Sequence, residues 1–118
     1  MPAEPDPLTL EEWLDGRLES APVELAEAVW SLVGGRLAEG EDGLVRAALE
    51  ALDIAAEGAA TRSDAVTLLA ADAILTYALE AAADPALGGS AKRARRLAER
   101  VGPGGLIGER FNEEERTE

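Results

Sequence analysis

The spacing of apolar side chains along the chain predicts a series of amphipathic helices. The first apolar stripe consists of Leu10, Trp13, Leu14 and Leu18. Thr9 and Glu12 have the three-residue spacing of a capping box, in which each side chain bonds the other residue's backbone N–H. We therefore expect the first helix over residues 9–19.

A second apolar stripe begins after Pro22, a residue that the first turn of a helix tolerates. It consists of Ala26, Val29, Trp30, Val33 and Leu37. The stripe passes through Gly34 and Gly35, each of which costs about 1 kcal/mol relative to alanine inside a helix. The helix therefore either ends at the glycines or uses them for a close contact. Because the apolar spacing reaches Leu37, we expect the helix to continue to about residue 39.

The third helix is expected over about residues 43–57, where Gly58 ends it. Its inward-facing residues are Val45, Ala48, Leu49, Leu52 and Ala56. Its solvated face consists of Arg46, Glu50, Asp53 and Glu57. This division of apolar and charged residues is typical of a helix that covers one side of a core.

Residues 64–83 form one long apolar segment whose large side chains point around the whole circumference of a helix. Thr61 and Asp64 repeat the capping arrangement, and the helix ends at Asp84 because a residue before proline avoids the α region. Such a helix must be enclosed by others. The predicted fold is therefore all-α, a compact bundle of four to five helices around residues 64–83.

Ser90 is expected to cap a fifth helix that runs to about residue 101. The predicted organisation is an extended acidic and proline-rich lead-in over residues 1–7, a helical bundle domain over 8–101, and a glycine-rich linker and tail over 102–118. A chain of 118 residues has room for one modest core.

The composition excludes most kinds of catalytic and metal-binding site. The chain has no His and no Cys, which excludes imidazole and thiol catalysis and the commonest metal ligands. We expect no catalytic, cofactor or metal site and no enzyme activity. Only four residues are aromatic, so the core is thin and suits sharing between protomers.

A net charge of −13 opposes binding of polyanions by the surface as a whole. The first residues are acidic and lack the basic start and apolar run of a signal peptide, so we expect a cytoplasmic protein. The apolar segment 64–83 has the length of a membrane span. Because Asp72 at its centre would cost about 2.5 to 3.5 kcal/mol on insertion scales, we expect no membrane association.

Asp72 is the sharpest candidate for an unusual environment, because its helical neighbours are leucines. If it is buried, it requires a hydrogen-bonding or ionic partner. The sequence is compatible with a buried structural carboxylate, with a ligand-binding or catalytic carboxylate, or with an exposed one. We expect the buried structural role.

The run Leu-Leu-Ala-Ala-Asp-Ala-Ile-Leu-Thr-Tyr-Ala-Leu-Glu, residues 68–80, resembles one core helix of isoprenyl diphosphate synthases. The resemblance covers thirteen residues. The aspartate-rich diphosphate and magnesium motifs of that family are absent. The resemblance therefore implies a shared packing requirement and no catalytic residue.

The predicted fifth helix is strongly basic in an otherwise acidic chain. Its cations are Lys92, Arg93, Arg95, Arg96 and Arg100, whereas residues 1–91 contain four basic and eighteen acidic residues. A narrow apolar stripe of Ala94, Leu97 and Val101 suits docking of this helix onto an acidic bundle, its own or a neighbour's. Binding to a protein partner, RNA or DNA is the other use of such a helix.

The tail holds three large apolar residues, Leu106, Ile107 and Phe111, ahead of an acidic end. These residues either dock onto a partner or fold back on the chain's own bundle. The leading functional hypothesis is a non-catalytic helical interaction or assembly module that self-associates and engages a partner through the basic helix and the tail. The alternative is anion or nucleic-acid binding through the basic helix, and the third hypothesis is a small-molecule or lipid pocket near Asp72 and Tyr77.

Overall fold

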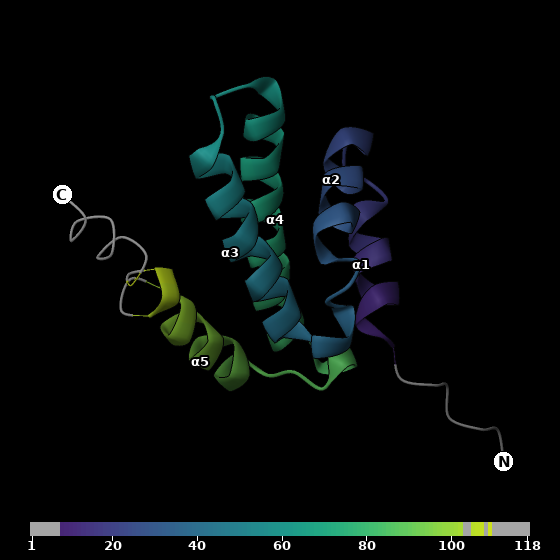
Figure 1. Cartoon of the computed structure of the whole chain (residues 1–118). Coiled ribbons are helices and arrows are strands. Elements are labelled where there is room, and N and C mark those ends of the chain that lie inside the picture. Colours follow the sequence, from purple (N-terminus) through teal and green to yellow (C-terminus); the bar gives the residue numbers. More distant parts are fainter. Residues whose placement is uncertain (1–7, 103–104, 108, 110–118) are drawn as a thin grey trace, which may run out of the picture.

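The computed structural model describes residues 8–102, 105–107 and 109, and this part of the chain is all-α (Figure 1). Its α-helices are α1 (Leu10–Leu18), α2 (Val23–Val33), α3 (Glu41–Glu57), α4 (Arg62–Ala83) and α5 (Ala91–Val101). Two short 3-10 helices, η1 (Leu37–Glu39) and η2 (Pro85–Leu87), follow α2 and α4. The predicted helical bundle is confirmed. The predicted lead-in over residues 1–7 lies outside the described residues.

Both predicted capping boxes are present. The backbone N–H of Glu12 donates to Thr9 Oγ1 at 3.1 Å, and that of Asp64 donates to Thr61 Oγ1 at 3.2 Å. In return, the backbone N–H of Thr61 donates to the Asp64 carboxylate at 2.9 Å. This bond, together with one from the Thr61 hydroxyl, lowers the pKa of Asp64 below its usual value.

The second helix is shorter than predicted, because α2 ends at Val33 and the expected continuation to residue 39 is wrong. Gly34 closes the helix with a backbone bond to Trp30 O at 3.0 Å. Two consecutive glycines lose more backbone entropy than other residues and offer no side chain to pack, so the helix gains little by crossing them. Leu37 still packs against the core, since η1 returns it there.

The hairpin of α3 and α4 is the centre of the fold (Figure 1). Its buried residues are mostly small: Ala47, Ala48 and Ala51 from α3, and Ala70, Ala71, Ala78, Ala81 and Ala82 from α4. Small side chains let two helices approach closely over a long contact. Larger residues, among them Leu44 and Ile74, fill the remaining core and are fully buried.

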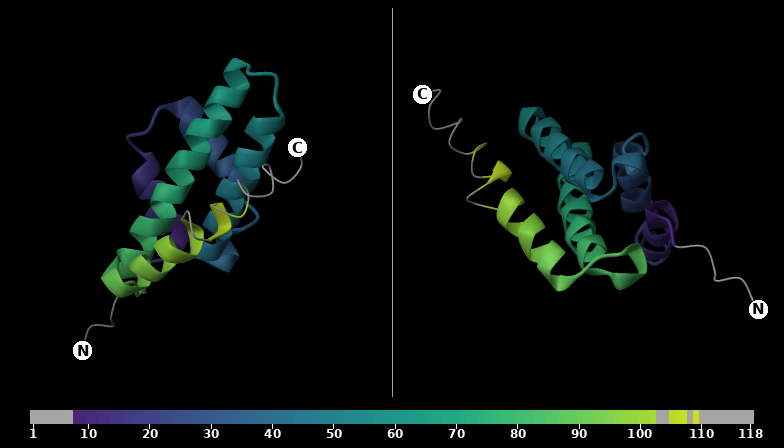
Figure 2. Two further views of the ribbon diagram at one scale, coloured as in Figure 1. Left: turned by 90° about the vertical axis from the view of Figure 1, so that its left-hand side faces the viewer. Right: turned by 90° about the horizontal axis from the view of Figure 1, so that it is seen from below.

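The remaining helices lie on opposite sides of this hairpin, with α1 and α2 on one side and α5 on the other (Figures 1 and 2). Viewed from the α5 side, α5 crosses the hairpin near the start of α3 and the end of α4 (Figure 2, left). Among the described residues, no helix lies over the opposite end of the hairpin, near residues 58–61, on this side.

The prediction that α4 is enclosed on every side is therefore wrong for its first half. Leu68 and Leu69 are 52% and 61% exposed. The reason is length, because α5 has 11 residues and α4 has 22, and helices rise by the same amount per residue. By length and composition alone, α4 also meets the criteria for a helix that could span a membrane. In the bundle, 33% of its apolar 18-residue window is buried.

Trp13 connects α1 to the end of α4. Its indole Nε1–H donates to Asp84 Oδ2 at 2.9 Å, and its ring meets Tyr77 edge-on with centroids 6.3 Å apart. The Arg17 guanidinium lies 4.6 Å from the same ring's centroid. The Ala86 backbone N–H and the Trp13 indole both donate to Asp84, and these bonds lower the pKa of its carboxyl below the usual value.

Substitution of Ile74 and Leu69 by alanine tests the two faces of α4. Ile74→Ala removes a fully buried side chain, so we expect the free energy of unfolding to fall by about 2 to 5 kcal/mol. Leu69→Ala, on the exposed face, should change it by less than about 0.5 kcal/mol. Urea unfolding measures both values, and equal losses would contradict the exposure of Leu69.

The hydrogen bonds to Asp84 predict acid-sensitive stability. A carboxyl whose folded pKa is lowered stabilises the fold above its unfolded pKa and loses that contribution as pH falls through the folded value. Asp84→Asn should therefore be less stable than the natural chain at pH 7, with the difference shrinking below pH 4. Thermal unfolding from pH 2.5 to 7 measures this, and a constant difference would count against it.

Candidate functional site

The basic helix α5 is docked onto its own bundle. Leu97 and Val101 are buried at 3% and 4% exposure. Arg93 Nε donates to Glu41 Oε1 at 2.8 Å, and Arg100 forms an ion pair with Asp42. In the single chain, α5 therefore docks onto its own acidic bundle. This docking uses two of the five candidate cations predicted from the sequence.

The other three cations face away from the bundle. Lys92, Arg95 and Arg96 are exposed, and within the described residues none of them forms an ion pair. Lys92 and Arg96 are four residues apart and so lie on one face of the helix. These three side chains are available to a partner.

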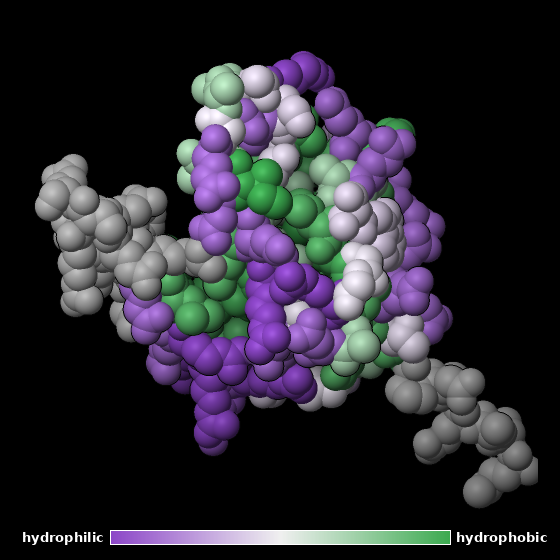
Figure 3. All heavy atoms as spheres, viewed as in Figure 1, coloured by the Kyte–Doolittle hydropathy of each residue, from purple (hydrophilic) through white to green (hydrophobic). Residues whose placement is uncertain are grey.

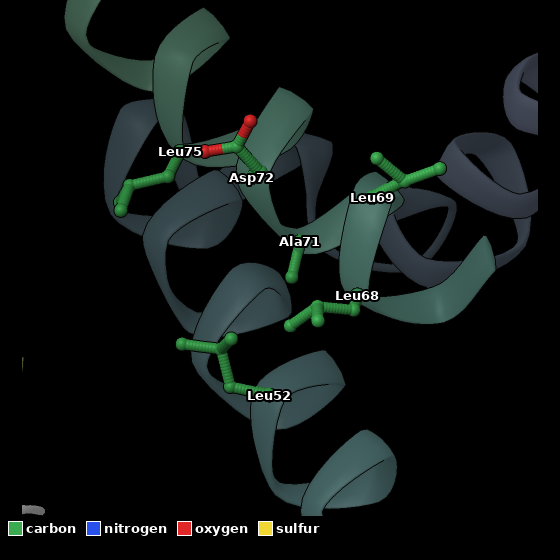
Figure 4. A pocket seen from close by; sticks show the side chains of 6 residues that line it. All are labelled: Leu52, Leu68, Leu69, Ala71, Asp72 and Leu75. Carbon is green, nitrogen blue, oxygen red and sulfur yellow. The ribbon is translucent and has the colours of Figure 1, made fainter. Parts of the chain in front are cut away.

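An apolar groove lies beside α5 on the uncovered part of the hairpin. It is lined by Leu52, Leu68, Leu69, Ala71, Asp72 and Leu75 and has a volume of about 400 Å³ (Figure 4). Leu52 of α3 and Leu68 of α4 extend toward one another across it. The space-filling view shows apolar side chains exposed between the upper part of α3 and the α1–α2 side, and a second apolar area beside α5 (Figure 3).

Asp72 lies at the edge of this groove, next to Leu75 (Figure 4). The prediction that Asp72 is buried is wrong, because its side chain is exposed and no charged residue is buried in the described part of the chain. Within that part, its carboxylate has neither a hydrogen bond nor an ion pair. Water solvates the charge, so the isolated chain does not need an internal partner for it.

Asp72 and Tyr77 do not line one pocket. Tyr77 packs on Trp13, on the side of α4 that meets α1, whereas Asp72 faces the groove. Five residues along a helix correspond to about 500° of rotation, which separates the two side chains by about 140°. The third hypothesis, a pocket formed by both, therefore loses its geometric basis.

The candidate residues of the tail divide between described and undescribed positions. Leu106 and Ile107 are half-buried and pack against the core cluster, as a tail that folds back would do. Phe111 lies outside the described residues. The described positions contain no cluster of acidic side chains that would hold a metal ion.

Of the groove residues, only Asp72 was singled out as a candidate from the sequence. The signal for them was present, since the apolar segment 64–83 is about twice as long as the helix expected to cover it. The pattern shows that leucines surround α4, but the length comparison is needed to find which of them stay uncovered. No family model, curated protein or solved structure matches the chain.

Reversing the charge of Arg93 and Arg100 should loosen α5. In the double variant Arg93→Glu and Arg100→Glu, carboxylates face Glu41 and Asp42, so attraction becomes repulsion. Exposed ion pairs are worth about 0.2 to 1 kcal/mol each, and the loss should shrink at high salt. Hydrogen exchange of the α5 amides measures the change.

The matched control is Lys92→Glu with Arg96→Glu, which makes the same change in net charge on the outward face. This variant should leave amide protection of α5 nearly unchanged. Equal loss of protection in both double variants would show that total charge, rather than the two ion pairs, holds α5 in place.

Proposed function

We propose that this chain is a non-catalytic helical interaction module whose α3–α4 groove binds the apolar face of a helix from a partner protein. The exposure of Leu68 and Leu69, two adjacent large apolar side chains on the central helix, carries the proposal. Covering apolar surface of this kind removes it from water, and this is the main favourable term in most protein association.

The groove continues an interface that already exists within the chain. Within the described residues, α5 packs on α4 with Leu97 and Val101 buried, and its Arg93 and Arg100 reach Glu41 and Asp42 at the start of α3. The uncovered half of the hairpin offers a further stretch of α4 with an apolar floor that Leu52 of α3 completes. A second amphipathic helix laid end to end with α5 would complete the cover, in the manner of helix-in-groove recognition.

The chemistry of the groove favours recognition over catalysis. Asp72 is the only ionisable side chain among its lining residues. General acid–base catalysis needs a positioned proton donor or acceptor with a tuned pKa and partners that orient it. A single solvated carboxylate on an apolar wall provides charge selectivity instead.

The body of the chain opposes the nucleic-acid alternative. Lys92, Arg95 and Arg96 form a small cationic face on a chain of net charge −13, which repels a polyanion at longer range. Self-association is the second candidate, because the exposed apolar groove of one copy could cover that of another. The two candidates differ in what contacts Leu69.

A photo-crosslinking amino acid at position 69, introduced in the native host, tests the proposal. We expect a discrete product in which the attached peptide comes from an apolar helix face of one other protein. The purified partner should then bind the natural chain, and Leu68→Glu should weaken this binding by about tenfold or more.

The matched control is the same crosslinker at Val23, which is 72% exposed but lies on α2, outside the groove. It should not yield that product. If position 69 attaches only to a second copy and light scattering shows a dimer, self-association replaces the proposal. If positions 69 and 23 give the same background, the groove is not an interaction site.

A further inference from the structure

Resting on the proposed function, we infer that the helix bound in the α3–α4 groove is basic as well as amphipathic, with a Lys or Arg side chain directed at Asp72 at the edge of the groove. The inference concerns the chemistry of the partner, which the apolar floor alone does not determine. Three observations support it.

The first observation is the charge of the hairpin. Residues 47–61 and 63–83 contain no Lys or Arg, whereas they contain the carboxylates Glu50, Asp53, Glu57, Asp64, Asp72 and Glu80. The one cation between these two stretches, Arg62, pairs with Glu24 at 3.0 Å. The lining of the groove itself therefore contains one carboxylate, Asp72, and no cation.

The second observation is the state of Asp72. Most of the other hairpin carboxylates have a partner: Glu50 pairs with Arg36, Glu80 lies 3.2 Å from Arg17, and Asp64 caps α4. Asp72 has none within the described residues although it borders the groove. A helix that covers the groove would remove water from this carboxylate, and a cation on that helix would offset the loss.

The third observation is the way in which the chain binds its own helix on the adjacent surface. Arg93 and Arg100 lie seven residues apart along one edge of the apolar stripe of α5, and they reach Glu41 and Asp42 at the start of α3. The hairpin thus already holds one helix by apolar residues flanked by arginines. The uncovered half presents a related combination, an apolar floor with the carboxylate of Asp72 beside it.

The same observations disfavour a second copy of this chain, docked through its own groove, as the binding partner. Two copies placed face to face would bring an Asp72 carboxylate from each copy into one interface, and the groove lining offers no cation to pair with either of them. Like charges in an interface act against association.

An NMR titration of the full 118-residue chain tests the inference. The probe is a synthetic peptide with the sequence of residues 90–101 and blocked ends, which is basic and amphipathic as a helix. The comparison probe has each Lys and Arg replaced by Glu and Glu99 replaced by Lys. We expect the basic peptide to shift the resonances of Leu52, Leu68 and Asp72, and the charge-swapped peptide to bind about tenfold more weakly or not at all.

Variants of Asp72 separate charge from packing. Asp72→Arg should weaken the basic peptide by about tenfold and strengthen the charge-swapped one, while Asp72→Asn should have an intermediate effect. Since Asp72 is exposed and unpaired, these substitutions should leave thermal stability nearly unchanged, which melting curves can verify. Leu68→Glu should abolish binding of both peptides.

Other outcomes overturn the inference. Equal binding of both peptides in the groove would reject a basic partner but leave the proposed function intact. If neither peptide binds while crosslinking at position 69 identifies a partner, the basic partner is again rejected and the proposed function stands. Shifts confined to Leu97 and Val101 would mean that the peptide replaces α5. Broadening of the groove resonances by phosphatidylcholine vesicles alone would assign the groove to a lipid surface.

Discussion

The packing of α3 against α4 over alanines is the contact on which the rest of the structure depends. The small side chains let the two helices run close together along most of their length, and they give the fold a rigid central pair. The same choice of residues leaves little volume in the core. Bulkier leucines are consequently placed along the edges of the pair, where a third element has to cover them.

Charge is divided between the parts of the molecule in a way that complements this packing. The hairpin and the α1–α2 side carry many of the carboxylates, and the short helix α5 carries five of the eleven cations. The attraction between them brings α5 to the start of α3, where Glu41 and Asp42 lie. In the described part of the chain, the farther half of the hairpin receives no such helix, and Leu68, Leu69 and Asp72 stay accessible together.

The features that could be predicted from sequence are those that depend on near neighbours. The capping boxes at Thr9 and Thr61, the end of α3 at Gly58 and the limits of α5 follow from a few adjacent residues. At Gly34, the backbone entropy of glycine favours the end of the helix, whereas the apolar spacing up to Leu37 favours its continuation. The sequence pattern alone does not show which of these two effects is larger. Exposure of Asp72 depends on how far a distant helix reaches, which periodicity within α4 does not encode.

Glu41 and Asp42 occupy the first turn of α3, where the partial positive charge of the helix end favours carboxylates, and the same two groups receive the arginines of α5. Two events that would otherwise be independent are thereby linked. Fraying of the first turn of α3 displaces the anchors of α5, and departure of α5 leaves two adjacent anions to repel one another at that turn. The stability of the first turn of α3 and the docking of α5, which lies far along the chain, are therefore coupled.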